Sequence, residues 1–106
     1  MTRAFPEIKK RLGFGLMRFP RTEDDTLDFD KISEMVDEFI LGGFNYFDTA
    51  HGYIKGLSEK AVKRCLSSRH DRESYVLTNK LTGTFFKSRE EVRPLFDKQL
   101  EECGVD

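Results

Sequence analysis

Three side chains with complementary chemistry follow two short apolar segments of this 106-residue sequence: Asp48, Tyr53 and Lys80. Asp48 ends one candidate strand, Tyr53 lies five residues further on, and Lys80 is near the end of the next candidate strand. A free tyrosine, with a pKa of about 10, is a poor proton donor at neutral pH, but an adjacent ammonium stabilises the phenolate. We therefore predict that Asp48 holds Lys80, that Lys80 acidifies Tyr53, and that Tyr53 protonates a developing alkoxide.

Spacing alone leaves a plain structural interpretation open. Asp48 and Lys80 have the charges of an ordinary ion pair, and Tyr53 has the character of an ordinary loop aromatic. Short motif matches also arise by chance. Without other information, this interpretation is favoured over the catalytic one.

The elements that must position these groups alternate between strands and helices. Mixed aromatic and β-branched segments, bounded by Gly, Pro or polar clusters, predict strands over residues 12–19, 44–49 and 75–81. Their centres, near Phe14, Phe47 and Thr78, are 33 and 31 residues apart, which is the length of a βαβ unit with parallel strands. In such folds functional groups gather at the C-terminal ends of the strands.

Apolar residues at helical spacing predict helices over residues 30–41, 59–66 and 88–103. Gly42 and Gly43 end the first helix, and Ser58 is the expected N-cap of the second. Ser88 and Glu91 have the spacing of a capping box. Pro94 predicts a kink or a late start in the third helix. The charged segment 69–73, which includes His70, is expected to be a solvated turn.

Composition limits the class of protein. With 38% hydrophobic and 35% charged residues, the sequence is typical of a soluble globular domain, and a net charge of −1 gives no basis for binding nucleic acid or an anionic membrane. Cys65 and Cys103 form no metal-ligand cluster and are expected to be reduced, half-buried thiols. The N-terminus, MTRAFPEIKK, lacks the apolar core of a signal peptide, so we expect a cytoplasmic protein.

Four stretches resemble the motifs of the aldo-keto reductase family. Residues 47–53 (FDTAHGY) and 56–59 (GLSE) resemble its signature, residues 77–80 (LTNK) its strand-three lysine, and residues 12–18 (LGFGLMR) its first-strand glycine motif. The likeness runs from about Arg11 to Asp106. The wording of residues 17–20 (MRFP) and 51–53 (HGY) is closest to the branch of the family that has an appended iron–sulfur domain.

The resemblance implies a TIM-barrel oxidoreductase that transfers hydride between NADPH and a carbonyl or alcohol substrate. It implies Tyr53 as general acid, Lys80 as the group that makes the phenol acidic, and Asp48 as the partner of the lysine. It also places the cofactor against the first-strand loop and near Asp48, so the implied cofactor-binding residues are Gly15, Leu16, Met17, Arg18 and Asp48.

The family's remaining catalytic residue is a histidine at the end of strand four, beyond Asp106. His51 is a poor substitute on geometric grounds, and we expect it to line the substrate side or to be solvated. We thus expect an α/β fold in which residues 1–106 form one domain, the first three βα units of an incomplete (β/α)8 barrel. A chain truncated in this way is expected to be inactive alone.

Two alternatives remain open. In one, the protein keeps the reductase fold but serves as a non-catalytic, cofactor-sensing binding subunit. In the other, a naturally short chain self-assembles through its open sheet edges, because unpaired strand edges readily pair with another chain.

Overall fold

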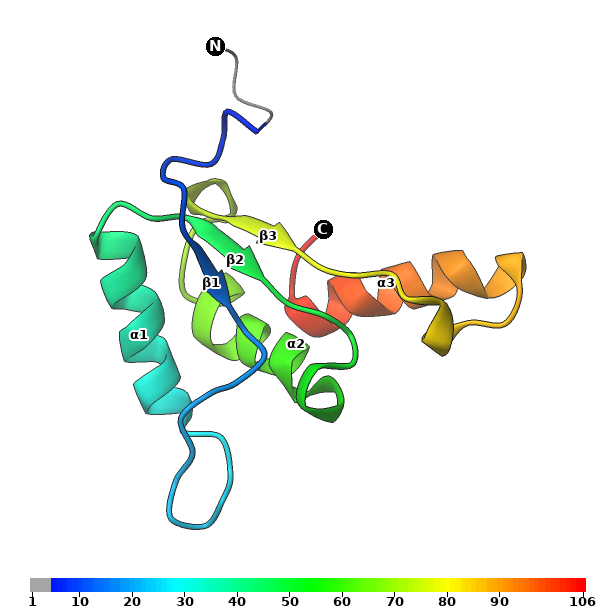
Figure 1. The fold of residues 1–106 in the computed structure, drawn as a ribbon, viewed down its shortest axis with the longest axis horizontal. Helices are drawn as coiled ribbons and strands as arrows, with labels where there is room; N and C mark the ends of the chain where they lie inside the picture. Colours follow the sequence, from blue (N-terminus) through cyan, green and yellow to red (C-terminus); the bar gives the residue numbers. More distant parts are fainter. Residues whose placement is uncertain (1–4) are drawn as a thin grey trace.

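The computed structural model describes residues 5–106, so the first four residues of the N-terminal segment discussed above lie outside the described part. Three parallel strands form one sheet in the order β1-β2-β3. The strands and α-helices are β1 (Gly13–Gly15), α1 (Phe29–Leu41), β2 (Tyr46–Asp48), α2 (Leu57–Val62), β3 (Val76–Thr78) and α3 (Val92–Cys103). Figure 1 shows them in chain order, with α3 reaching away from the sheet. The predicted alternation of parallel strands and helices is confirmed.

Each strand is shorter than predicted. The register pairs Gly13 with Tyr46 and Gly15 with Asp48, and Asp48 in turn with Thr78, so the shared ladder is three residues long. Apolar composition extends beyond it, but strand structure requires a neighbour at hydrogen-bonding distance. The predicted segments were therefore correct in place and too long at both ends.

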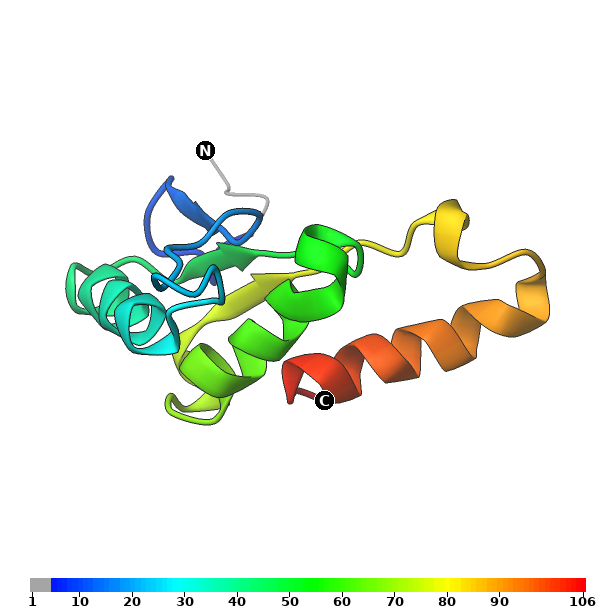
Figure 2. The ribbon, with the colours of Figure 1, turned by 90° about the horizontal axis from the view of Figure 1, so that it is seen from below.

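The core lies on the face of the sheet that the helices cover. Side chains alternate along a strand, so Phe14, Phe47 and Leu77 share the face opposite to that of Asp48. Phe47 is fully buried and contacts the rings of Phe14 and Phe39, the latter from α1. Figure 2 shows α2 and α3 together on one side of the sheet. Within residues 5–106, no α-helix packs on the face that carries Asp48.

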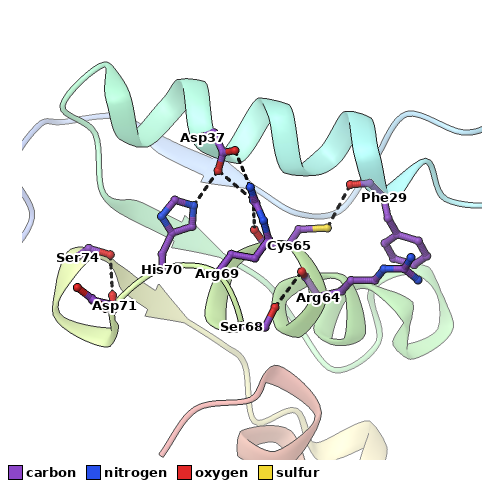
Figure 3. A network of polar contacts seen from close by, with 9 residues as sticks. All are labelled: Phe29, Asp37, Arg64, Cys65, Ser68, Arg69, His70, Asp71 and Ser74. Carbon is purple, nitrogen blue, oxygen red and sulfur yellow. Dashed lines mark hydrogen bonds and ion pairs between the residues drawn. The ribbon is translucent and has the colours of Figure 1, made fainter.

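Helix α1 is anchored to the segment that follows α2 (Figure 3). Arg69 donates from both terminal nitrogens to the Asp37 carboxylate, at 2.9 and 2.7 Å, and His70 Nε2 lies 2.8 Å from the same carboxylate. The guanidinium of Arg69 holds the pKa of Asp37 below its ordinary value. The prediction of a solvated turn over residues 69–73 holds for Arg69, which is exposed, whereas His70 is half-buried. The ion pair with Asp37 was not predicted, because a partner on a distant helix carries no local sequence signal.

Helix α2 begins one residue earlier than Ser58 and is not capped by it. Gly56 precedes the helix with φ of 90°, a left-handed conformation that glycine adopts at little cost. The helix continues into a π-helical turn, Lys63–Ser67. The prediction that Ser58 is the N-cap was wrong, since its hydroxyl bonds to other segments.

Helix α3 begins after the predicted capping box. The reciprocal bonds of Ser88 and Glu91 are both present in the 3₁₀ turn Arg89–Glu91. Pro94 then falls in the first turn of α3, where a backbone N–H has no partner within the helix. The predicted late start is confirmed.

Both cysteines are free and buried. In residues 5–106 no helix combines the length and apolar character needed to span a bilayer.

Candidate active site

The ends of the three strands lie side by side because the strands are parallel and in register. Gly15, Asp48 and Thr78 occupy equivalent positions. The backbone N–H of Leu16 donates to the Asp48 carbonyl at 2.9 Å, and that of Thr49 donates to the Thr78 carbonyl at 2.8 Å. This ladder brings the loops that follow β1, β2 and β3 to one edge of the sheet.

The ammonium of Lys80 is the centre of this edge. Its Nζ donates to Asp48 Oδ1 at 2.9 Å, to the Thr49 carbonyl at 3.0 Å and to Tyr53 Oη at 2.9 Å. These three bonds use all three donors of the ammonium. The predicted meeting of carboxylate, phenol and amine is confirmed as geometry.

The charge state of Lys80 follows from these contacts. Burial favours the neutral amine, but the hydrogen bonds to Tyr53 and Asp48 outweigh it and raise the pKa of Lys80 above its ordinary value. The amine is therefore an ammonium at neutral pH. Because Lys80 donates to the phenol oxygen, that oxygen acts as acceptor and the Tyr53 O–H proton is left to be donated elsewhere.

The loop that carries Tyr53 is closed by a buried pair of hydroxyls. Thr49 Oγ1 and Ser58 Oγ lie 2.7 Å apart, and Ser58 donates to the Leu16 carbonyl at 2.6 Å. Both side chains have no exposed surface. One serine thus joins the loop after β1, the end of β2 and the start of α2.

The backbone directly after Tyr53 is strained. Ile54 and Lys55 have φ of 52° and 53°, in the left-handed region that costs an L-residue about 1–2 kcal/mol. Such conformations persist only where the surroundings hold them in place. Ile54 packs against the core, and the loop ends are held by the hydroxyl pair.

His51 is partly buried and paired, in contrast to the solvated alternative. Its Nδ1 lies 2.7 Å from Oε1 of Glu59, and its side chain is 18% exposed. The ring also packs edge-on against Phe85, with centroids 4.9 Å apart. His51 is therefore engaged by Glu59 and Phe85.

The residues predicted to bind a cofactor differ in their placement. Met17 and Arg18 are exposed in the loop after β1, and a Cβ built on Gly15 would meet no atom within 4 Å. Leu16, by contrast, is 3% exposed and packs in the core, with its N–H and C=O both bonded. Its placement does not support the predicted contact, because the first residue after β1 turns towards the helices. Cofactor binding by Gly15, Met17, Arg18 and Asp48 stays a prediction.

Two contributors were missed by sequence reasoning. The Thr49 carbonyl is the third acceptor for Lys80, and Glu59 binds both His51 and Asn79. A backbone acceptor has no signal in the sequence. Glu59 was quoted within a motif, but its burial depends on how α2 docks.

The chain is similar to known proteins in sequence and in fold. The model of the aldo/keto reductase family matches residues 11–106. The aldo-keto reductase ausK of Emericella nidulans is 30% identical over 69 residues, which are 65% of this chain and 17% of that protein. A putative aldo-keto reductase from Pseudomonas aeruginosa superposes with a TM-score of 0.73 and 25% identity, over 92% of this chain and 40% of its own. An aldo-keto reductase from Bacillus halodurans in its holo form superposes with a TM-score of 0.70 and 26% identity, over 93% of this chain and 37% of its own.

The chain has part of the fold of these relatives. The chain spans less than half the length of each of these relatives. Its three parallel strands and their helices are the first three βα units of a (β/α)8 barrel, as predicted. The iron–sulfur branch stays a prediction. The family model matches residues 11–106, and the motif residues lie together at one edge of the sheet. The chain therefore belongs to the aldo/keto reductase family.

Proposed function

We propose that this chain carries the proton-donating part of the active site of an oxidoreductase that reduces a carbonyl substrate with NADPH. The observation that carries the proposal is the 2.9 Å bond from Lys80 Nζ to Tyr53 Oη, with Asp48 on the same ammonium. The family match supports the class of reaction. In this arrangement Tyr53 donates its proton to the carbonyl oxygen, and the adjacent ammonium stabilises the phenolate that remains.

The C-terminal ends of the strands leave room for a cofactor beside the loop after β1. There is free space above Gly15, and Met17 and Arg18 are exposed beside it. Arg18 offers a planar set of donors suited to phosphate groups. Bound there, NADPH would supply the hydride that the carbonyl carbon accepts. Asp48 keeps Lys80 charged and in place while Tyr53 gives up its proton.

The test is Tyr53→Phe in the complete polypeptide that contains residues 1–106. Loss of a positioned general acid is expected to lower kcat by about 10²–10⁴-fold, measured as NADPH consumption with an aldehyde substrate. The Kd for NADPH, measured by fluorescence, should not change. Tyr75→Phe is the matched control, because Tyr75 is buried against Phe47 on the helix side of the sheet. An equal loss of turnover and NADPH binding in Tyr53→Phe would contradict the general-acid role.

A second outcome would favour the alternative of a binding subunit. If the unmodified polypeptide binds NADPH but reduces none of a panel of aldehydes and ketones, the site binds without catalysing.

A cytoplasmic location and self-association through the edges of β1 and β3 remain predictions from the sequence. Fractionation and size-exclusion chromatography, respectively, test them.

A further inference from the structure

Glu59 is a buried carboxylate without a role in the proton donation described above. It lies in the first turn of α2, and its side chain is 1% exposed. A carboxylate removed from water is costly unless it is paired and hydrogen-bonded. Both oxygens of Glu59 have such partners, and the partners come from different loops.

Each partner of Glu59 lies close in sequence to one member of the Tyr53–Lys80 pair. His51, whose Nδ1 lies 2.7 Å from Oε1, precedes Tyr53 by two residues in the loop after β2. Asn79 donates to Oε2 at 2.7 Å and directly precedes Lys80. The Asn79 carbonyl oxygen Oδ1 also accepts from the Lys80 backbone N–H, at 2.8 Å. A continuous set of bonds therefore runs from the Tyr53 loop through Glu59 to the backbone of Lys80.

The Tyr53 loop needs such a restraint. Three successive residues after Tyr53, residues 54–56, have positive φ, and two of them are not glycine. Without restraint this segment would relax towards ordinary backbone conformations and carry Tyr53 with it. The Thr49–Ser58 pair holds the ends of the loop, whereas Glu59 holds its middle through His51.

We propose that Glu59 is a positioning residue that sets the distance between Tyr53 Oη and Lys80 Nζ by holding both of their loops. The proposal rests on the proposed function for its kinetic consequence. Glu59 bonds to His51 and Asn79, and the reacting phenol and ammonium bond to each other. Its effect is therefore exerted through its two partners.

The kinetic test uses Glu59→Ala, Asn79→Ala and the double variant in the complete polypeptide. A misplacement of about 1 Å lowers turnover by about 10²-fold, and we expect a loss in kcat of that order for Glu59→Ala. The KM for NADPH should stay unchanged, because the partners of Glu59 are His51 and Asn79, and neither is an expected cofactor contact. Once Glu59 is absent, Asn79→Ala should cause little further loss, since both remove the same link.

Conservative and control variants separate positioning from general damage. Glu59→Gln should recover most of the turnover, because an amide can accept from Asn79 and donate to an unprotonated His51 Nδ1. Glu101→Gln, an exposed carboxylate on α3, should leave both kcat and KM unchanged. Unchanged kcat in Glu59→Ala, or fully multiplicative losses in the double variant, would overturn the proposal.

A structural measurement keeps the proposal separate from the proposed function. In a crystal structure of Glu59→Ala, the distance from Lys80 Nζ to Tyr53 Oη should exceed the present 2.9 Å. Absence of any carbonyl reduction by the unmodified polypeptide would refute the proposed function alone, and this distance would still decide the role of Glu59. An unaltered distance refutes positioning. If Glu59→Ala does not fold, Asn79→Ala decides the matter by the same two measurements.

Discussion

Replacement of Ser58 distinguishes the role predicted from the sequence from the role found in the structure. At an N-cap, Ser→Ala costs about 1 kcal/mol and Ser→Gly only a few tenths, because glycine is itself tolerated there. In the structure the Ser58 hydroxyl instead joins the Leu16 carbonyl and the Thr49 hydroxyl. The two roles predict opposite orders for the alanine and glycine variants.

The magnitude follows from the groups that lose a partner. Leu16 is 3% exposed and Thr49 fully buried, so Ser58→Ala leaves one buried carbonyl and one buried hydroxyl unpaired. Each such group costs about 1–3 kcal/mol, and for the two together we expect a loss of about 2–6 kcal/mol in the free energy of unfolding. Ser58→Gly should cost about 0.5–1 kcal/mol more than Ser58→Ala, because the position is helical.

The assay is urea denaturation followed by far-UV circular dichroism, with the m-value as a check that the same transition is measured. Ser68→Ala is the matched control: Ser68 is exposed, its hydroxyl donates to the Arg64 carbonyl at 3.0 Å, and its loss should cost less than about 0.5 kcal/mol. Adding Thr49→Val to Ser58→Ala should cost less than Thr49→Val alone, since the orphaned hydroxyl is removed. A glycine variant more stable than the alanine variant would refute the reasoning.

Three further predictions concern other parts of the chain. Lys55→Gly should raise the free energy of unfolding by about 0.5–1 kcal/mol in the same assay, because glycine accepts the left-handed φ of 53° without strain; a loss of stability would contradict this. Asp37→Asn should lower it by about 0.5–1 kcal/mol at neutral pH, a small effect because the side chains of Asp37 and Arg69 are 44% and 37% exposed to screening solvent. Since the pair lowers the pKa of Asp37 from 3.8, its contribution is fully present above that pH and is lost as the pH falls further, so the two forms should converge in acid. Burial, with the nearby Glu59 charge, raises the pKa of the Cys103 thiol to about 12, so iodoacetamide should modify it only after unfolding; rapid modification of the native chain would show that the site opens.

Local patterns were sufficient to locate the elements. The apolar spacing over residues 30–41 and the Ser88–Glu91 capping box are interactions between residues a few positions apart, so the sequence alone indicates them. The regular interval between strand centres likewise predicted parallel pairing. Strand length was less predictable, because the ladder depends on where neighbouring strands run side by side.

Contacts between residues far apart in the sequence could be predicted only in part. Asp48, Tyr53 and Lys80 were predicted to meet because parallel strands end at one edge, and they do. The bond between Arg69 and Asp37 was missed, since nothing near residue 69 in sequence specifies a partner on α1.

The sequence by itself determined the order of strands and helices, the family motifs and the identity of the three groups at the strand ends. It could do so because periodicity, capping and side-chain chemistry are properties of residues near one another in the chain. Only the tertiary structure decided that Ser58 joins three segments and that Glu59 lies between the loops of Tyr53 and Lys80. Burial and partner choice for a polar side chain depend on which distant segments dock against it, and that is settled by packing.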